Sequence, residues 1–359
     1  MQESEAMGGN VVGKRVKKDF VPMKTGLVIS SLAASLLLAV LVSLMFGKYP
    51  IGVGDICSFF LWKIFNARVS LSVDREVLEN ILLNIRLPRI VAAMFVGASL
   101  SISGASFQAM FINPLVSPGI LGVLAGASFG AALAMVFSKS WIVVQSSCFI
   151  FGFIAVMISM GVARLYKGNT VLLLILGGVI SGALFTSLLS IVKYLADPYN
   201  QLPAIVYWLM GGLTLVDLGT LKNTAIPVIA GIALIVSLSG YLNVLSMGDE
   251  EARTMGVPVE RIRFILIVMA TMLSAITVVL AGMVGWVGLI IPHMARMIVG
   301  PDNRVLIPVS ALTGALYLIL VDDVSRLAFT TEIPLGIITS LIGIPFFAAV
   351  LKRANRGWS

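Results

Sequence analysis

Residues 262–284 read IRFILIVMATMLSAITVVLAGMV, and this stretch decides the fold class. It contains a single charged residue, Arg263, and it is long enough to cross a bilayer as a helix, which takes about 20 mostly apolar residues. The rest of the 359-residue chain has the same character, because 58% of its residues are hydrophobic, 12% are charged and the mean hydropathy is +1.03. A water-soluble domain carries about 25% charged residues. The sequence therefore predicts a protein whose solvent is a membrane.

Similar apolar runs lie on both sides of this stretch, and we expect ten membrane-spanning helices in all. They are placed at residues 26–46, 88–110, 119–138, 141–163, 171–192, 224–245, 262–284, 286–299, 305–328 and 335–351. No linker or low-complexity tract divides them. The prediction is an all-α membrane protein with one transmembrane domain, residues 26–351, between an N-terminal tail, 1–25, and a C-terminal tail, 352–359.

Two segments in different halves of the chain have related patterns. Residues 98–122 and residues 275–299 each form a predicted helix that runs into a stretch broken by Gly and Pro. Paired interruptions of this kind mark inverted repeats in transporters. We interpret the chain as about ten helices in two inverted-repeat-like halves.

The basic residues set the expected orientation. If the N-terminus is cytoplasmic, most of the 25 Lys and Arg residues lie on the cytoplasmic side. Most of the others fall in one long outer loop, 47–87, and long loops weigh less in the positive-inside rule. Both termini are therefore expected in the cytoplasm. The net charge of +8 does not indicate a nucleic-acid partner, because the basic residues are scattered between long apolar runs.

Several chemistries lack their residues in this sequence. A phosphate-binding P-loop needs Gly-Lys followed by Ser or Thr, and neither Gly13-Lys14 nor Gly47-Lys48 meets that pattern. His293 is the only histidine, so no His/Cys metal site is expected. We expect no catalytic residue, no cofactor and no bound metal, and any ATP hydrolysis must take place on another subunit.

The most polar stretch between spans is residues 245–263, LSMGDEEARTMGVPVERIR. Asp249 can cap a helix with an acidic first turn, Gly256 can end that helix and Pro258 can begin the next. The pattern predicts two short helices on the cytoplasmic face, at about residues 246–261. From the residues alone, an ordinary solvated loop and a docking element for a soluble motor subunit both stay open.

The chain also resembles a known family. The stretch Gly248 to Val257, GDEEARTMGV, is similar to the coupling loop of permeases that import iron–siderophores, heme and vitamin B12. Further family-like motifs follow in the same order along nearly the whole chain: IRLPR at 85–89, SGASFQ at 103–108, NPLVSPG at 113–119, YWLMGG at 207–212, GWVGLIIPHMAR at 285–296, PLGI at 334–337 and GIPFF at 343–347. Each motif is weak alone, but their shared order and spacing make the resemblance specific.

The resemblance implies a set of partners. They are two ATP-hydrolysing subunits, an extracytoplasmic substrate-binding protein and a second permease subunit, most simply a second copy of this chain. The setting would be the lipid bilayer of a prokaryotic inner membrane. The implied cargo is a metal chelate, with a ferric siderophore preferred over heme, cobalamin or an oxyanion.

The resemblance also assigns roles to residues. Those implied to couple to the ATPase are Gly248, Asp249, Glu250, Ala252, Met255, Gly256 and Val257. Arg86, Arg89 and Arg326 are implied to receive acidic residues of the binding protein, although on the residues alone they could equally be interfacial anchors. Asn113 and Leu115, with Asn169 and Thr170 opposite, are implied to form a cytoplasmic gate.

A different class of function competes with this one. A secondary carrier driven by an ion gradient would need an acidic residue within the membrane, and Asp322 or Asp323 would have to serve. The scarcity of ionisable residues in the other spans argues against such a carrier.

Overall fold

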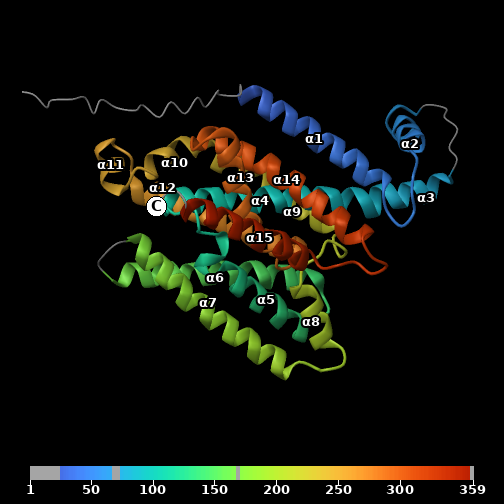
Figure 1. Ribbon diagram of the computed structural model, residues 1–359. Helices are drawn as coiled ribbons and strands as arrows, with labels where there is room; N and C mark the ends of the chain where they lie inside the picture. Colours follow the sequence, from blue (N-terminus) through green and yellow to red (C-terminus); the bar gives the residue numbers. More distant parts are fainter. Residues whose placement is uncertain (1–24, 67–72, 167–169, 356–359) are drawn as a thin grey trace, which may run out of the picture.

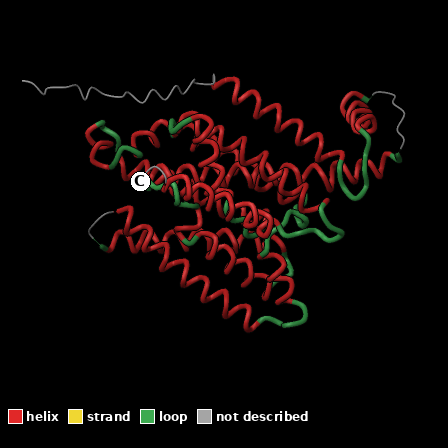
Figure 2. Tube along the Cα trace, viewed as in Figure 1, coloured by secondary structure: helices red, strands yellow, loops and turns green. Residues whose placement is uncertain are grey.

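The computed structural model describes residues 25–66, 73–166 and 170–355, and this part of the chain is built from helices and their connections (Figures 1 and 2). The helices that are long and apolar enough to cross a membrane are α1 (Thr25–Met45), α6 (Trp141–Leu165), α7 (Thr170–Leu195), α9 (Leu218–Ser237), α12 (Val259–Ala281), α14 (Asn303–Leu327) and a continuous run made of α3 (Arg75–Glu79), η1 (Asn80–Arg86) and α4 (Leu87–Met110). Three shorter apolar helices are α5 (Val123–Phe137), α13 (Val287–Val299) and α15 (Leu335–Asn355). Together they account for the ten predicted spans.

Four short helices connect or flank these spans. They are α2 (Val53–Phe65), α8 (Gln201–Leu209), α10 (Ser239–Leu245) and α11 (Asp249–Thr254), and a 3-10 turn, η2 (Pro118–Leu121), precedes α5. The described part of the predicted outer loop 47–87 is therefore largely helical. It contains α2 and the extension of α4 back to Arg75, neither of which hydropathy alone distinguishes from a loop.

One predicted span differs clearly from the structure. The sequence predicts 224–245, whereas α9 begins at Leu218 and ends at Ser237, and α10 follows it. The earlier start has a local cause. The Asp217 carboxylate accepts a hydrogen bond of 2.9 Å from the backbone N–H of Thr220 and caps the helix. The polar first turns, which hydropathy leaves out of the span, are therefore helical.

Glycines allow the central helix α4 to lie very close to its neighbours. α4 packs against α12, α13 and α14, and 83% of its spanning window is buried. A Cβ atom on Gly104 would lie 1.8 Å from the carbonyl oxygen of Gly288 in α13, and one on Gly97 would lie 2.1 Å from that of Gly314 in α14. Small residues permit this backbone approach, which is typical of helix packing in membranes. The segments 98–122 and 275–299 thus touch directly, although their relation as inverted repeats stays an interpretation.

The helices α5, α6 and α7 form a second group beside the central one, drawn in green in Figure 1. Their shared core contains Phe129, Phe151 and Phe185, whose rings contact one another. The spanning windows of α1, α6 and α7 are apolar and only about a third buried or less, which leaves most of each helix exposed and suits contact with lipid.

Candidate functional site

The predicted site residues lie at opposite ends of the spanning helices. The short helix α11 marks one end, seen at the left of Figure 1, and α3 marks the other, seen at the right. We call them the α11 end and the α3 end. The residues predicted to couple to an ATPase lie at the α11 end. Arg86, Arg89 and Arg326 lie at the α3 end, although α4 and α14 are far apart in the sequence.

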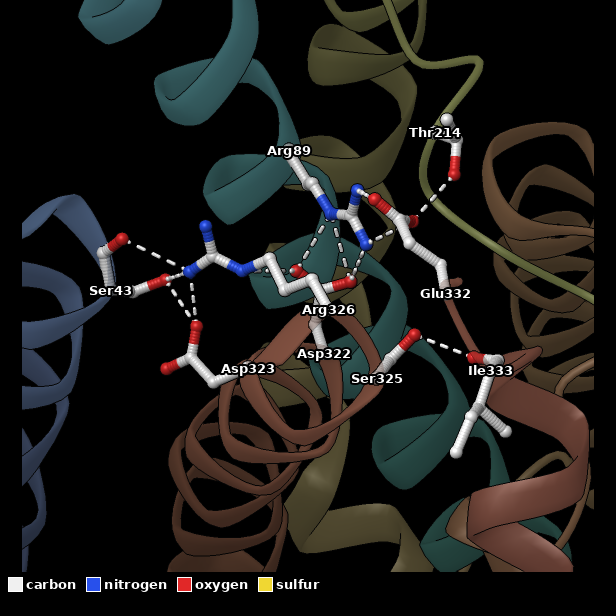
Figure 3. Close-up of polar contacts among 9 residues, drawn as sticks. All are labelled: Ser43, Arg89, Thr214, Asp322, Asp323, Ser325, Arg326, Glu332 and Ile333. Atoms are coloured by element: carbon white, nitrogen blue, oxygen red, sulfur yellow. Dashed lines mark hydrogen bonds and ion pairs between the residues drawn. The ribbon is translucent and has the colours of Figure 1, made fainter. Parts of the chain in front are cut away.

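Arg89 is the centre of a buried ionic cluster (Figure 3). Its Nη2 lies 2.8 Å from the carboxylate of Asp322 on α14, and its Nη1 lies 3.0 Å from that of Glu332, in the segment before α15. Glu332 in turn accepts a hydrogen bond of 2.9 Å from the Thr214 hydroxyl. The Asp322 side chain is 2% exposed. Arg89 therefore ties α4 to α14 and to two connecting segments.

The other two arginines stabilise the end of α1. Arg326 donates to the carbonyl oxygen of Ser43 at 3.0 Å and to its hydroxyl at 2.6 Å, and it also pairs with Asp323. Arg86 donates to the carbonyl of Met45 at 3.2 Å and to those of Leu44 and Tyr49. A cation at a helix C-terminus satisfies the last carbonyls and complements the helix dipole.

These contacts restrict how a docking partner could reach the three arginines. Arg89 and Arg326 pair with the carboxylates of Asp322, Asp323 and Glu332, while Arg86 donates to backbone carbonyls, so the three arginines and the three carboxylates balance in charge. The arginines are 4–9% exposed, whereas the sequence predicts them at a docking surface. They nevertheless line one pocket at the α3 end, together with Lys48 and Glu332. A docking partner would therefore have to enter that pocket, and the docking role stays a prediction.

The α11 helix is clamped onto the start of α12. Arg263, on α12, donates to the Asp249 carboxylate at 2.9 Å through Nη1, and a second contact runs through Nη2. This hydrogen bonding lowers the pKa of Asp249 from its ordinary value. Ala252, on the inward side of α11, is fully buried. The short helix is therefore attached to the start of α12.

Two details of this segment differ from the sequence prediction. Gly248, with φ +120°, takes the position before the helix, and Asp249 is its first residue, so Asp249 does not cap α11 with its side chain. Pro258 leads directly into the long helix α12. Residues 246–261 thus contain one short helix and the first turn of a spanning helix. Gly256 follows the helix end with φ +77°, as the prediction of a glycine stop requires.

Exposed apolar residues flank α11 on both sides. Met247 is 60% exposed and Met255 is 59% exposed, on either side of the exposed Glu250. Methionine is a flexible apolar side chain that adapts to a partner's surface. Sequence reasoning missed Met247 and Arg263. The signal for Arg263 was its position as the only charge in the run 262–284.

The predicted gate residues Asn113 and Leu115 form a tight turn after α4. The Asn113 side chain accepts from the backbone N–H of Leu115 at 2.9 Å, and Ile112 has a positive φ of 49°. The Leu115 side chain is 53% exposed. Asn169 lies outside the described residues, and Thr170 is the first residue of α7. The pairing of these two with the turn stays a prediction.

These features define a class of protein. The chain is a polytopic helical membrane protein with a short acidic helix, α11, at one end of its spanning helices and a buried ionic cluster at the other. Comparisons with known proteins agree. A model described as the FecCD transport family matches residues 35–353. The chain therefore belongs to the FecCD transport family, and it is a transport permease of the ATP-binding-cassette importer type, not an enzyme.

Individual relatives cover nearly the whole chain. The molybdate import system permease protein MolB of Haemophilus influenzae is 37% identical over 330 residues, which are 92% of this chain and 96% of that protein. A protein of Helicobacter pylori named as a probable iron chelatin transport system permease is 36% identical over 90% of this chain and 97% of its own. A solved structure described as an inward-facing metal-chelate type ABC transporter has a TM-score of 0.81 and 35% identity, with 91% of this chain and 99% of that chain covered.

Proposed function

We propose that this chain is the membrane subunit of an importer that carries a metal chelate, with a ferric siderophore as the first candidate. Two ATP-hydrolysing subunits bind at the α11 end, which faces the cytoplasm of a prokaryote, and both chain termini lie on that side. A substrate-binding protein docks at the α3 end, and a second permease subunit completes the pathway. The observation that carries the proposal is α11 itself, a short acidic helix fixed to a spanning helix and open to a partner.

The contacts explain how force would pass from a motor to the core. A partner that grips α11 also moves α12, because the Asp249–Arg263 pair and the buried Ala252 join the two helices. α12 in turn is bonded to the central helix, since the Ser103 hydroxyl on α4 donates to the carbonyl of Ala270 at 3.0 Å. A shift at α11 is thus passed to the most buried helix of the protein.

The test of coupling should use a residue that no internal contact needs. Ala252 is unsuitable, because replacing a fully buried residue would disturb packing. Met255 is exposed, so Met255→Glu should leave folding unchanged, while Met255→Leu serves as the matched control. We expect Met255→Glu to lower substrate-stimulated ATP hydrolysis about tenfold in the reconstituted complex, at normal membrane insertion. Wild-type coupling in Met255→Glu would refute a role for this surface.

At the α3 end, the proposal is that a carboxylate of the binding protein enters the arginine pocket and competes with Glu332 for Arg89. Support comes from the pocket's lining and from Glu332, whose side chain is 24% exposed and so is the most displaceable of Arg89's partners. Arg suits this exchange because its planar guanidinium group can donate two parallel hydrogen bonds to one carboxylate.

The preference for a metal chelate rests on relatives and not on a binding site in this chain. The Helicobacter pylori relative is named for iron chelatin and the solved neighbour for a metal chelate, while MolB is named for molybdate. Heme, cobalamin and oxyanions are therefore the competing cargoes. Uptake of radiolabelled ferric chelate, molybdate and cobalamin by cells with and without the gene separates them.

An ion-driven carrier, the competing function that the sequence raised, agrees with neither the family nor the structure. Such a carrier needs an acidic group free to bind and release an ion. Asp322 is 2% exposed and pairs with Arg89 at 2.8 Å, while Asp323 pairs with Arg326. Both carboxylates therefore form ion pairs with arginines of the same chain.

A further inference from the structure

The helix α2 (Val53–Phe65) has two apolar sides. Its inner side is buried, with Ile56 at 4% and Phe59 at 0% exposure, and the Phe59 ring contacts those of Phe60 and Trp62. Lys63 also ties the helix to α3 through a contact of 2.6 Å with Glu79. α2 is thus a packed part of the protein and needs no further partner to hold it.

The second side is exposed and forms a regular stripe. Its members are spaced four, eight, eleven and twelve residues from the first, which places them on one helical face. They are Val53, Cys57, Leu61, Ile64 and Phe65. Ile64 and Phe65 are 67% and 73% exposed. We call these five residues the α2 apolar face. None of them is charged, and a contiguous exposed face of this kind marks contact with a partner or a membrane.

The position of α2 is fixed at the level where α1 ends. The backbone N–H of Ile51 donates to the carbonyl of Met45, the last residue of α1, at 3.2 Å. The chain therefore turns back at the end of α1, and α2 begins two residues later. In Figures 1 and 2 α2 is seen nearly end-on, whereas α1 and α4 run across the view. α2 thus lies across the direction of the spanning helices.

The surroundings of α2 match a lipid surface. The adjoining α1 presents Leu37, Leu38 and Leu41 outward, at 54–66% exposure, as a lipid-facing surface. Two cations lie near the Trp62 ring, Arg75 of α3 at 5.1 Å and Lys63 of α2, which also pairs with Glu79, at 5.7 Å from its centre. An apolar helix face bordered by basic residues and an aromatic ring suits the boundary between phospholipid headgroups and acyl chains.

We propose that α2 is an interfacial helix, whose apolar face is buried in the phospholipid layer at the α3 end of the protein. The occupant is phospholipid because α2 follows directly on the end of α1, whose outer side is apolar, and because the α2 apolar face offers a protein partner no charged side chain. The proposal goes beyond the transport function, since it concerns how this end of the protein is held at the membrane surface.

The chain provides its own probe position. Cys57 is exposed within the α2 apolar face, whereas Cys148 is fully buried in α6. The full-length protein is labelled with bimane at Cys57 and reconstituted in vesicles of phosphatidylethanolamine and phosphatidylglycerol. We expect strong quenching by lipids that carry a nitroxide near the headgroup, and quenching by aqueous iodide at least about fivefold weaker than at a control position. The control is Glu76→Cys on the exposed side of α3, in a Cys57→Ser background.

Other outcomes identify other occupants. Iodide quenching at Cys57 equal to that of the control would overturn the proposal. So would dipolar broadening between nitroxides on Cys57 of two copies, which would place a second copy on the face. A second variant, Ile64→Glu, removes an exposed side chain without touching the core, and it should increase iodide quenching at Cys57 severalfold. No change in Ile64→Glu would also contradict the proposal.

Discussion

At the scale of single residues, the buried charges at the α3 end depend on one another. Asp322 pairs with Arg89 and lies 3.7 Å from Arg326, with its side chain 2% exposed. Removing one partner of a buried pair leaves the other charge uncompensated, which costs about 3–5 kcal/mol. Asp322→Asn should therefore strongly lower the midpoint of thermal unfolding in detergent. Glu332→Gln, at a more exposed partner, should cost only about 1 kcal/mol or less.

The comparison between these two variants decides the interpretation. A small effect of Asp322→Asn on the unfolding midpoint, together with loss of transport, would instead suit a carboxylate that acts in the transport cycle. The expected order is a large effect for Asp322→Asn and a small one for Glu332→Gln, measured at the same protein and detergent concentrations.

The sequence singled out the arginines at this end but could not predict their contacts within the protein. Arg86 and Arg89 stand out because charges are rare near apolar runs. Their partners could not be predicted, because Asp322 is 233 residues from Arg89 and only the packing of α4 on α14 brings the two together. For the same reason, hydropathy could not show that arginines at the end of a span would be nearly buried.

The pair at the α11 end predicts a specific pH response. Arg263 holds the pKa of Asp249 below its ordinary value, which is about 3.9. The stabilisation is therefore complete above that ordinary pKa and is lost as the pH falls through the lowered, folded-state pKa. Asp249→Asn removes it at all pH values. We expect lower amide protection factors, which are corrected for the intrinsic pH dependence of exchange, in α11 of Asp249→Asn at pH 7, whereas the wild type should fall to the same protection only in acid.

A charge exchange provides the control for this pair. Asp249→Arg combined with Arg263→Asp should recover part of the protection that either single change loses, because the pair can form in the reverse sense. Equal protection in the wild type and Asp249→Asn at pH 7 would show that the pair does not hold α11.

At the scale of helices, the close approach of α4 to α13 predicts that glycines differ in how well they tolerate an added methyl group. Gly104→Ala would place a methyl group 1.8 Å from a backbone oxygen, and backbone cannot yield as a flexible side chain does. We expect destabilisation of about 3 kcal/mol or more and poor recovery of folded protein after detergent extraction. Gly161→Ala, in α6, has no atom within 4 Å of the new Cβ and should behave like the wild type. Similar behaviour of both variants would mean that α4 and α13 pack less closely than described.

Hydropathy predicted the spanning helices well, because twenty apolar residues in a row have few alternatives in a bilayer. Hydropathy failed where local polar interactions set the ends of helices or where a helix is short. Asp217 starts α9 six residues before the predicted span, and α2 could not be separated from the loop around it. The motif singled out residues 248–257, whose coupling role stays a prediction, but the attachment of α11 to α12 depends on the Asp249–Arg263 contact, which no local pattern reveals.

At the scale of the whole molecule, the two ends must face opposite sides of the membrane, and the proposed function requires α11 to face the cytoplasm. Glu250 is exposed on α11, and Tyr199, 88% exposed, lies between α7 and α8 at the opposite end of α7 from Thr170. In a Cys57→Ser background, Tyr199→Cys should react with a membrane-impermeant maleimide in sealed, right-side-out vesicles. Glu250→Cys should react only after the vesicles are opened by detergent, since the ATP-hydrolysing partners and their nucleotide are cytoplasmic. Labelling of Glu250→Cys in sealed vesicles would reverse the orientation, and it would remove the basis for placing the ATPase at α11 and the binding protein at the arginine pocket.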